Sequence, residues 1–200
     1  MRKRTDMKVK DFFKLFFIYV LLVLIGSIGY VLSFKTPIFA SMDVFFYRGI
    51  SIIILWGALM AVVMLVLKAA KFKKLITIRD VLLLFAGFCC VHVVIFTHLP
   101  VTADRSITVF MLGYMSDNAD KSYTVDEMED YFVKRYVGDY GAFEKRFHEQ
   151  LVTGTIEDTG DGSCRITESG IRLMKIYEVT ADLYGLDDKL IHPDKEGGEQ

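Results

Sequence analysis

Three long apolar segments occupy most of the first half of the chain. They run Leu15–Phe34, Gly49–Leu67 and Val81–Leu99, each is 19 or 20 residues long, and none contains Asp, Glu, Lys or Arg. A helix rises about 1.5 Å per residue, so each segment is long enough to cross a hydrocarbon core about 30 Å thick. The pattern therefore predicts three transmembrane helices between residues 15 and 99.

A cleaved signal peptide is the alternative for the first segment, because the basic leader 1–14 precedes it. The apolar run is long for such a peptide. The residues that follow, Phe34-Lys35-Thr36-Pro37, contain no clear small-x-small cleavage site. We therefore expect the segment to remain as an uncleaved anchor.

Small residues spaced four apart occur in each apolar segment, and such pairs let helices approach one another closely in lipid. The pairs are Gly29 and Ser33, Gly57 and Ala61, and Ala86 and Cys90. They could pack the three helices against each other or against a helix of a partner protein.

Apolar residues recur at helical spacing after Pro100 and predict three consecutive helices. The stripes are Ile107, Phe110, Met111 and Tyr114; then Val125, Met128, Phe132 and Tyr136; then Tyr140, Phe143, Phe147 and Leu151. Thr124 and Glu127 have the spacing of a capping box, in which each side chain satisfies a free backbone N–H at the start of the second helix. Gly138 and Gly154 end the second and third helices.

Residues 154–174, GTIEDTGDGSCRITESGIRLM, predict a hairpin followed by a fourth helix. Residues 155–158 and 163–167 are short strand candidates around a turn at 160–162, with Ile156 and Ile166 as inward anchors. The helix ends at Gly185. Its apolar face consists of Ile171, Met174, Tyr177, Ala181 and Tyr184.

This order of helix, helix, helix, hairpin and helix over residues 106–185 resembles the winged-helix superfamily. The step Arg-Ile-Thr-Glu-Ser-Gly at 165–170 looks like the Leu-Thr-x-x-Gly step of bacterial winged-helix regulators. The expected fold class is mainly α, with three transmembrane helices in 15–99 followed by a small α+β winged-helix-like domain at 100–186. A disordered tail at 187–200 would follow, since it is polar and rich in glycine. The resemblance implies a fold and leaves the function open.

The charge distribution predicts how the chain lies in a membrane. Lys and Arg number six in the leader 1–14 and five in residues 68–79, but the segment between the first two spans holds only Lys35 and Arg48. Cationic loops stay in the cytoplasm. We therefore expect an integral protein of the cytoplasmic (inner) membrane with a cytoplasmic N-terminus and an extracytoplasmic C-terminal domain.

DNA binding fits the charge of the C-terminal half poorly. Residues 101–200 hold 21 Asp and Glu against 11 Lys and Arg, whereas DNA affinity depends largely on cations. Under the resemblance, the helix at Tyr140–Val152 takes the place of the recognition helix, and the wing is acidic. We expect this helix to dock a protein instead. Its candidate docking residues are Phe143, Lys145, Arg146 and His148.

Polar side chains gather where the third span leaves the bilayer. They are His98, Thr102, Asp104, Arg105 and Ser106. One interpretation is structural, with Asp104 or Ser106 capping the next helix and Arg105 lying among lipid phosphates. The other is that Arg105 binds the phosphate of a lipid-linked substrate.

Two further polar features lie in or beside the spans. His92 is in the middle of the third span, where an ionisable group is a functional candidate, although one hydrogen bond to a neighbouring helix would satisfy it. Asp43 and Arg48 flank the start of the second span and could pair there.

No catalytic or metal-binding motif occurs in the sequence, so we expect no cofactor and no metal. The leading hypothesis is a non-catalytic accessory subunit. It would dock on a larger integral membrane protein, in contact with membrane lipids, in a system that makes or exports an envelope polysaccharide. One alternative is a membrane-tethered winged-helix transcription regulator, which needs the opposite orientation. Another is a small enzyme acting on a lipid headgroup through His98, Asp104 and Arg105.

Overall fold

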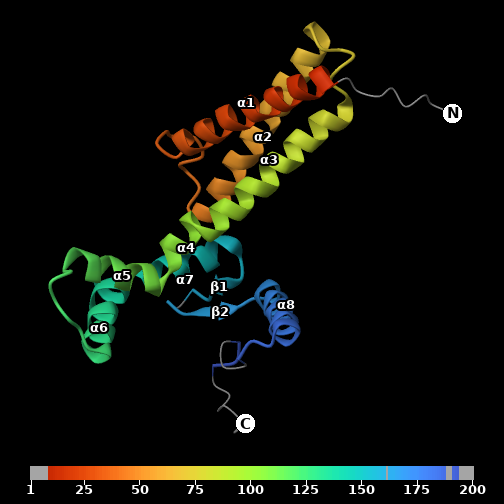
Figure 1. Cartoon of the computed structure of the whole chain (residues 1–200). Coiled ribbons are helices and arrows are strands. Elements are labelled where there is room, and N and C mark those ends of the chain that lie inside the picture. The colour runs from red at the N-terminus through yellow and green to blue at the C-terminus, as the bar shows by residue number, and fades with distance from the viewer. Residues whose placement is uncertain (1–8, 161, 188–190, 194–200) are drawn as a thin grey trace. The chain divides into compact units, whose positions relative to one another are not determined.

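The computed structural model of the chain describes residues 9–160, 162–187 and 191–193, and these residues are mainly helical (Figure 1). They belong to two compact units, Met1–Asp120 and Lys121–Gln200. Most of the predicted leader 1–14 and of the predicted tail 187–200 lies outside the described residues.

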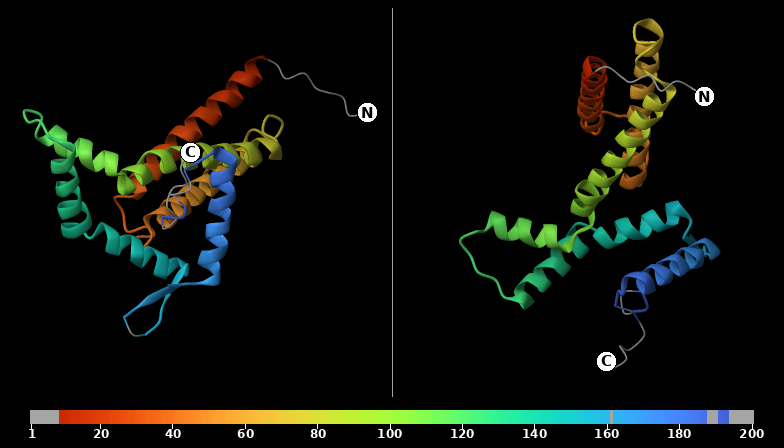
Figure 2. Two further views of the ribbon diagram at one scale, coloured as in Figure 1. Left: turned by 90° about the horizontal axis from the view of Figure 1, so that it is seen from below. Right: turned by 45° about the vertical axis from the view of Figure 1, so that its right-hand side comes forward.

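The first unit contains the three helices that are long and apolar enough to cross a membrane, which confirms that part of the predicted fold. They are α1 (Val9–Ser33), α2 (Phe45–Ala70) and α3 (Ile78–His98), and they run alongside one another (Figures 1 and 2). The start of α1, the end of α2 and the start of α3 lie at one end of this bundle (Figure 1). We call it the basic end. It carries Lys10, Lys14, Lys68, Lys71, Lys73, Lys74 and Arg79.

Large side chains fill the space above the glycines inside the bundle. A Cβ atom on Gly29 would lie 2.2 Å from the ring of Trp56. Gly57 faces Cys89 less tightly, since a Cβ there would lie 2.9 Å from its Sγ. Two of the predicted small-residue pairs therefore contribute a glycine to the packing of the bundle itself. The third pair, Ala86 and Cys90, is exposed on α3.

Two short helices follow the third span within the same unit. They are α4 (Pro100–Arg105) and α5 (Ile107–Asp117). Proline suits the first turn of α4 because it lacks the N–H that has no helical partner there. Ser106 caps α5, since its hydroxyl accepts a hydrogen bond from the backbone N–H of Val109 at 3.2 Å. This is one of the two caps that the sequence suggested.

The second unit begins with the predicted capping box. Thr124 donates its backbone N–H to Glu127 at 2.8 Å and accepts from the N–H of Glu127 at 3.3 Å. The helix that starts here is α6 (Val125–Phe132), which widens into the π-helical segment η1 (Val133–Asp139). The next helix, α7 (Ala142–Thr153), lies between two glycines in the left-handed region, Gly141 and Gly154.

A hairpin and a last helix complete the second unit. The strands β1 (Ile156–Asp158) and β2 (Cys164–Ile166) are antiparallel, and α8 spans Glu168–Tyr184. Thr167 caps α8 by accepting from the N–H of Gly170 at 3.2 Å. The sheet of the described residues has only these two short strands, and such a sheet does not establish a winged helix. Ile166 is less enclosed than an inward anchor would be: its side chain lies against Gly170 of α8, but it is 50% exposed.

Candidate functional site

The intramembrane histidine connects two helices of the bundle. His92 on α3 is buried, with 5% of its surface exposed, and its Nε2 lies 3.0 Å from the hydroxyl of Ser27 on α1. A hydrogen bond of this kind to a neighbouring helix is enough to satisfy a histidine within a transmembrane span. The ring also stacks on Phe88, with ring centroids 3.9 Å apart.

The tautomer of His92 follows from its second partner. Nδ1 lies 2.9 Å from the carbonyl oxygen of Phe88, and a carbonyl only accepts, so Nδ1 carries the hydrogen. In the neutral ring, Nε2 then accepts from Ser27. The Ser27 hydroxyl also lies 2.7 Å from the carbonyl oxygen of Val23, so two acceptors share its one hydrogen.

A second polar contact ties α1 to α2. The indole N–H of Trp56 donates to the hydroxyl of Ser33 at 2.8 Å, and that hydroxyl donates to the carbonyl of Gly29 at 2.8 Å. Tyr30 on α1, about one turn after Ser27, packs edge-on against the imidazole of His92 with ring centroids 5.2 Å apart. Its buried hydroxyl has no hydrogen-bond partner among the described residues. These residues form a polar core of the bundle, and each contact joins or braces helices.

The predicted cluster at the membrane exit does not converge on one point. His98 hydrogen-bonds through Nδ1 to the carbonyl of Val94 at 2.9 Å, and Thr102 donates to the carbonyl of Thr97 at 3.2 Å. Ser106 caps α5. Asp104 and Arg105 each have a partner within the chain. The two hydroxyls and the imidazole thus hydrogen-bond to the local backbone.

The pairing suggested for Asp43 and Arg48 is replaced by another contact. The Arg48 guanidinium donates to the carbonyl oxygens of Thr36 at 2.9 Å, Ile38 at 3.2 Å and Phe34 at 3.3 Å. Its Cζ atom also lies 5.7 Å from the centroid of the Phe34 ring. A guanidinium has five N–H donors in a fixed fork, which suits several carbonyls at once. Arg48 therefore holds the connection between α1 and α2.

The candidate docking residues lie on α7, and most of them are exposed. Phe143 is 66% exposed and stacks with Phe147, which is 42% exposed, at a centroid distance of 6.3 Å. Lys145 and His148 are also exposed. Arg146 differs, because it pairs with the buried carboxylate of Glu149 at 2.7 Å. Arg146 is thus engaged inside its own helix, and the aromatic pair is the main exposed feature.

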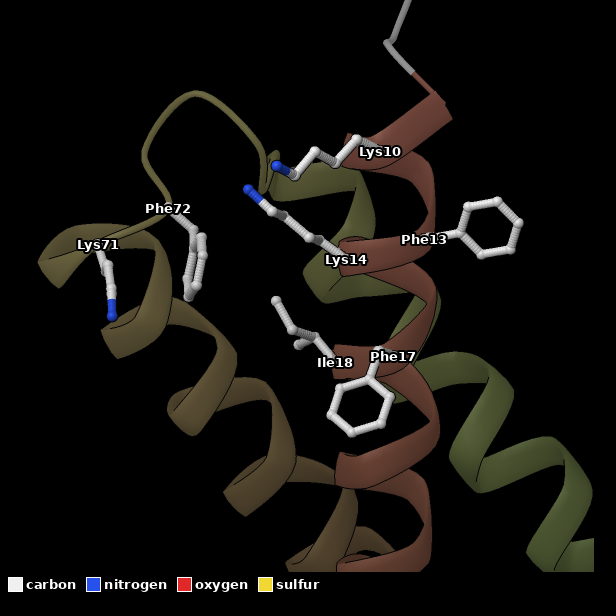
Figure 3. A pocket seen from close by; sticks show the side chains of 7 residues that line it. All are labelled: Lys10, Phe13, Lys14, Phe17, Ile18, Lys71 and Phe72. Carbon is white, nitrogen blue, oxygen red and sulfur yellow. The ribbon is translucent and has the colours of Figure 1, made fainter.

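The sequence-based reasoning missed a set of residues at the basic end. Lys10, Lys14 and Lys71 line a groove between α1 and the end of α2, together with Phe13, Phe17, Ile18 and Phe72 (Figure 3). In the sequence analysis these lysines served only to predict the orientation of the chain in the membrane. The sequence did contain an indication of this groove. Lysines and phenylalanines occur together at the start of the first span and just after the second, and three crossings of the membrane place these two ends on the same side.

Comparison with known proteins returned no match to any protein-family model, to any curated protein or to any solved structure. The functional argument therefore depends on the residues and contacts described above.

Proposed function

We propose that the chain is a non-catalytic accessory subunit that docks on a larger integral membrane protein through its second unit. One observation supports this most directly. Among the described residues of the second unit, the buried hydrophobic side chains are Met128 and Ala181, whereas much larger ones are exposed. A unit of this size normally buries its aromatic and branched residues in a core of its own.

The exposed apolar residues are arranged on helix faces. On α7 they include the stacked pair Phe143 and Phe147. On α8, Ile176, Val179 and Leu183 are exposed at the i, i+3, i+7 spacing of one helical face. Contiguous exposed apolar patches of this kind mark interaction sites. Aromatic anchors with a polar rim, here Lys145 and His148, are also the usual composition of the energetic centre of an interface.

The outer face of α3 offers a second contact to such a partner. Gly87 has no atom within 4 Å of the position that a Cβ would take, and Ala86 and Cys90 beside it are exposed. Small residues allow the backbone of another helix to come close in lipid. The partner would then contact the subunit both within the bilayer and through the second unit.

We also propose the finer features of the fold and the orientation. The order α6, α7, β1, β2 and α8, with Thr167 capping α8 at the Thr-Glu-Ser-Gly step, supports a reduced winged helix. The cationic residues at one end of the bundle support a cytoplasmic location for that end, with the second unit on the outer side of the inner membrane. The partner class that we propose is a system that makes or exports an envelope polysaccharide. Such a system handles lipid-linked phosphates at the outer surface of the membrane, where the proposed orientation places the second unit.

Co-purification tests the proposal. A tagged full-length chain, extracted from its native membranes in mild detergent, should bring down an integral membrane protein in stoichiometric amount. The double variant Phe143→Ser/Phe147→Ser should lose that protein. Val125→Ser should keep it, because Val125 is exposed but lies on α6, away from the proposed face. A clean monomer from wild-type membranes, with an activity of its own, would contradict the proposal.

A reporter fused after Gln200 tests the orientation. Alkaline phosphatase activity there supports the outer location. Green fluorescence instead would place the second unit in the cytoplasm and favour the membrane-tethered regulator.

A further inference from the structure

The groove at the basic end of the bundle has an apolar side and a cationic side. It measures about 690 Å³, within the range of about 300–1,000 Å³ typical of small-molecule sites. The apolar side consists of Phe17, Ile18 and Phe72. In Figure 3 the ammonium ends of Lys10 and Lys14 extend from α1 toward the side of the groove where Phe72 lies.

A second hollow adjoins the groove and is more cationic. It measures about 350 Å³ and shares Lys14, Lys71 and Phe72 with the first. The loop that follows α2 adds Lys73, Lys74 and Leu75, and α1 adds Asp11. The two hollows thus form one continuous surface that is apolar at one end and basic at the other.

The lysines of this surface are not neutralised by the rest of the chain that the structure describes. Five of them, Lys10, Lys14, Lys71, Lys73 and Lys74, line the two hollows, against the single carboxylate of Asp11. Within residues 9–160, 162–187 and 191–193, none of these lysines has an ion-pair partner. Like charges on one surface repel one another, so an anion bound among them would be stabilised.

The position of the surface along the bundle fits the boundary of a bilayer. Lys14 precedes the apolar run Leu15–Phe34, and Lys71 follows the apolar run Gly49–Leu67. Phe17 and Ile18 lie within the first run, roughly one helical turn, or about 5 Å, beyond Lys14. Phosphates would therefore lie at the lysines while an acyl chain follows the phenylalanines.

We propose that this surface binds an anionic phospholipid, with its phosphate held by Lys10 and Lys14, Lys71 adding positive charge to the same groove, and an acyl chain along Phe17, Ile18 and Phe72. Basic pockets between helix ends are the usual sites for anionic headgroups. The apolar side distinguishes a lipid from free phosphate, which would gain nothing from it. This inference stands apart from the docking function, because it uses the opposite end of the chain and a different ligand.

Native mass spectrometry of the full-length chain tests the proposal. The detergent-solubilised protein is mixed with equimolar phosphatidylglycerol and phosphatidylcholine of identical acyl chains. The wild type should retain phosphatidylglycerol in preference by about tenfold, which corresponds to about 1.4 kcal/mol. The double variant Lys14→Glu/Lys71→Glu should lose the preference. The matched variant Lys35→Glu should keep it, because Lys35 follows α1 at the other end of the bundle.

A further measurement on the wild type keeps the proposal falsifiable if the double variant does not fold. Glycerol phosphate at millimolar concentration should fail to displace the bound lipid, because it cannot contact the apolar side. Displacement by glycerol phosphate would show a phosphate site and overturn the assignment to a lipid. Equal retention of the two lipids by the wild type, or a preference that survives in the folded double variant, would overturn the site itself.

Discussion

The imidazole of His92 in α3 lies 3.0 Å from the hydroxyl of Ser27 in α1 and forms a polar bridge between these two helices. Hydrogen bonds between transmembrane helices contribute about 0.6 kcal/mol on average and up to about 1.7 kcal/mol. We therefore expect His92→Leu and Ser27→Ala each to lower the free energy of unfolding in detergent by about 1 kcal/mol. The double variant should lose no more than the worse single variant. Additive losses would show that the two side chains act separately.

Replacement by leucine should destabilise the protein at Gly29 but leave its stability unchanged at Gly87. A leucine at Gly29 would collide with the ring of Trp56, whereas the space above Gly87 is open. Overpacking of this kind costs about 1–3 kcal/mol, so Gly29→Leu should unfold at a lower temperature and Gly87→Leu should match the wild type. Trp56 is the one tryptophan of the chain, and its fluorescence reports the transition directly.

The same pair separates folding from docking. On the proposed function, Gly87→Leu should fold normally and still recover less of the membrane partner in co-purification. Undiminished recovery would remove the outer face of α3 from the proposed interface and leave only the second unit.

Arg48→Lys should loosen the connection between α1 and α2. An ammonium group cannot reach the carbonyl oxygens of Phe34, Thr36 and Ile38 in the geometry that the guanidinium uses. We expect faster tryptic cleavage after Lys35 in detergent, with a cost in stability of about 1 kcal/mol. Arg79→Lys at the start of α3 serves as the matched control, and equal cleavage rates in the two variants would contradict the bracing role.

The start of α6 should become less stable in acid. Hydrogen bonds from the backbone N–H and the hydroxyl of Thr124 lower the pKa of Glu127 below its ordinary value of 4.5. A depressed pKa means that the stabilisation is fully present above the unfolded value and is lost as the pH falls through the folded one. The protection of the amides in the first turn of α6, relative to their intrinsic exchange rate at each pH, should therefore fall below about pH 4. In Glu127→Gln this acid dependence should be absent, and its persistence would place the titration elsewhere.

The features that the sequence predicted correctly are those that local chemistry determines. The three spans follow from uncharged runs that only a bilayer or a large core could bury. The capping box at Thr124 formed as its spacing indicated. A capping box with aspartate in place of glutamate, formed by Thr77 and Asp80, caps α3, and its spacing in the sequence is the same.

The features that it missed depend on tertiary packing. The stripe from Phe143 to Leu151 has the period of a buried helix face, yet Phe143 is exposed and Glu149 is buried. Periodicity shows which residues share a face, and only the packing of α7 against other elements decides which face is covered. Likewise, the lysines at the start of α1 and at the end of α2 form one groove only once both helices are placed.

Site-specific photocrosslinking from position 143 tests the docking function most directly. A photoreactive amino acid replaces Phe143 in cells that express the chain at its native level, and a second strain carries it at Glu129, an exposed position on α6. Irradiation should join position 143, and not position 129, to one integral membrane protein. Crosslinks from position 143 only to lipid or to soluble cytoplasmic proteins, or equal crosslinks from both positions, would contradict the proposal that α7 docks a membrane partner.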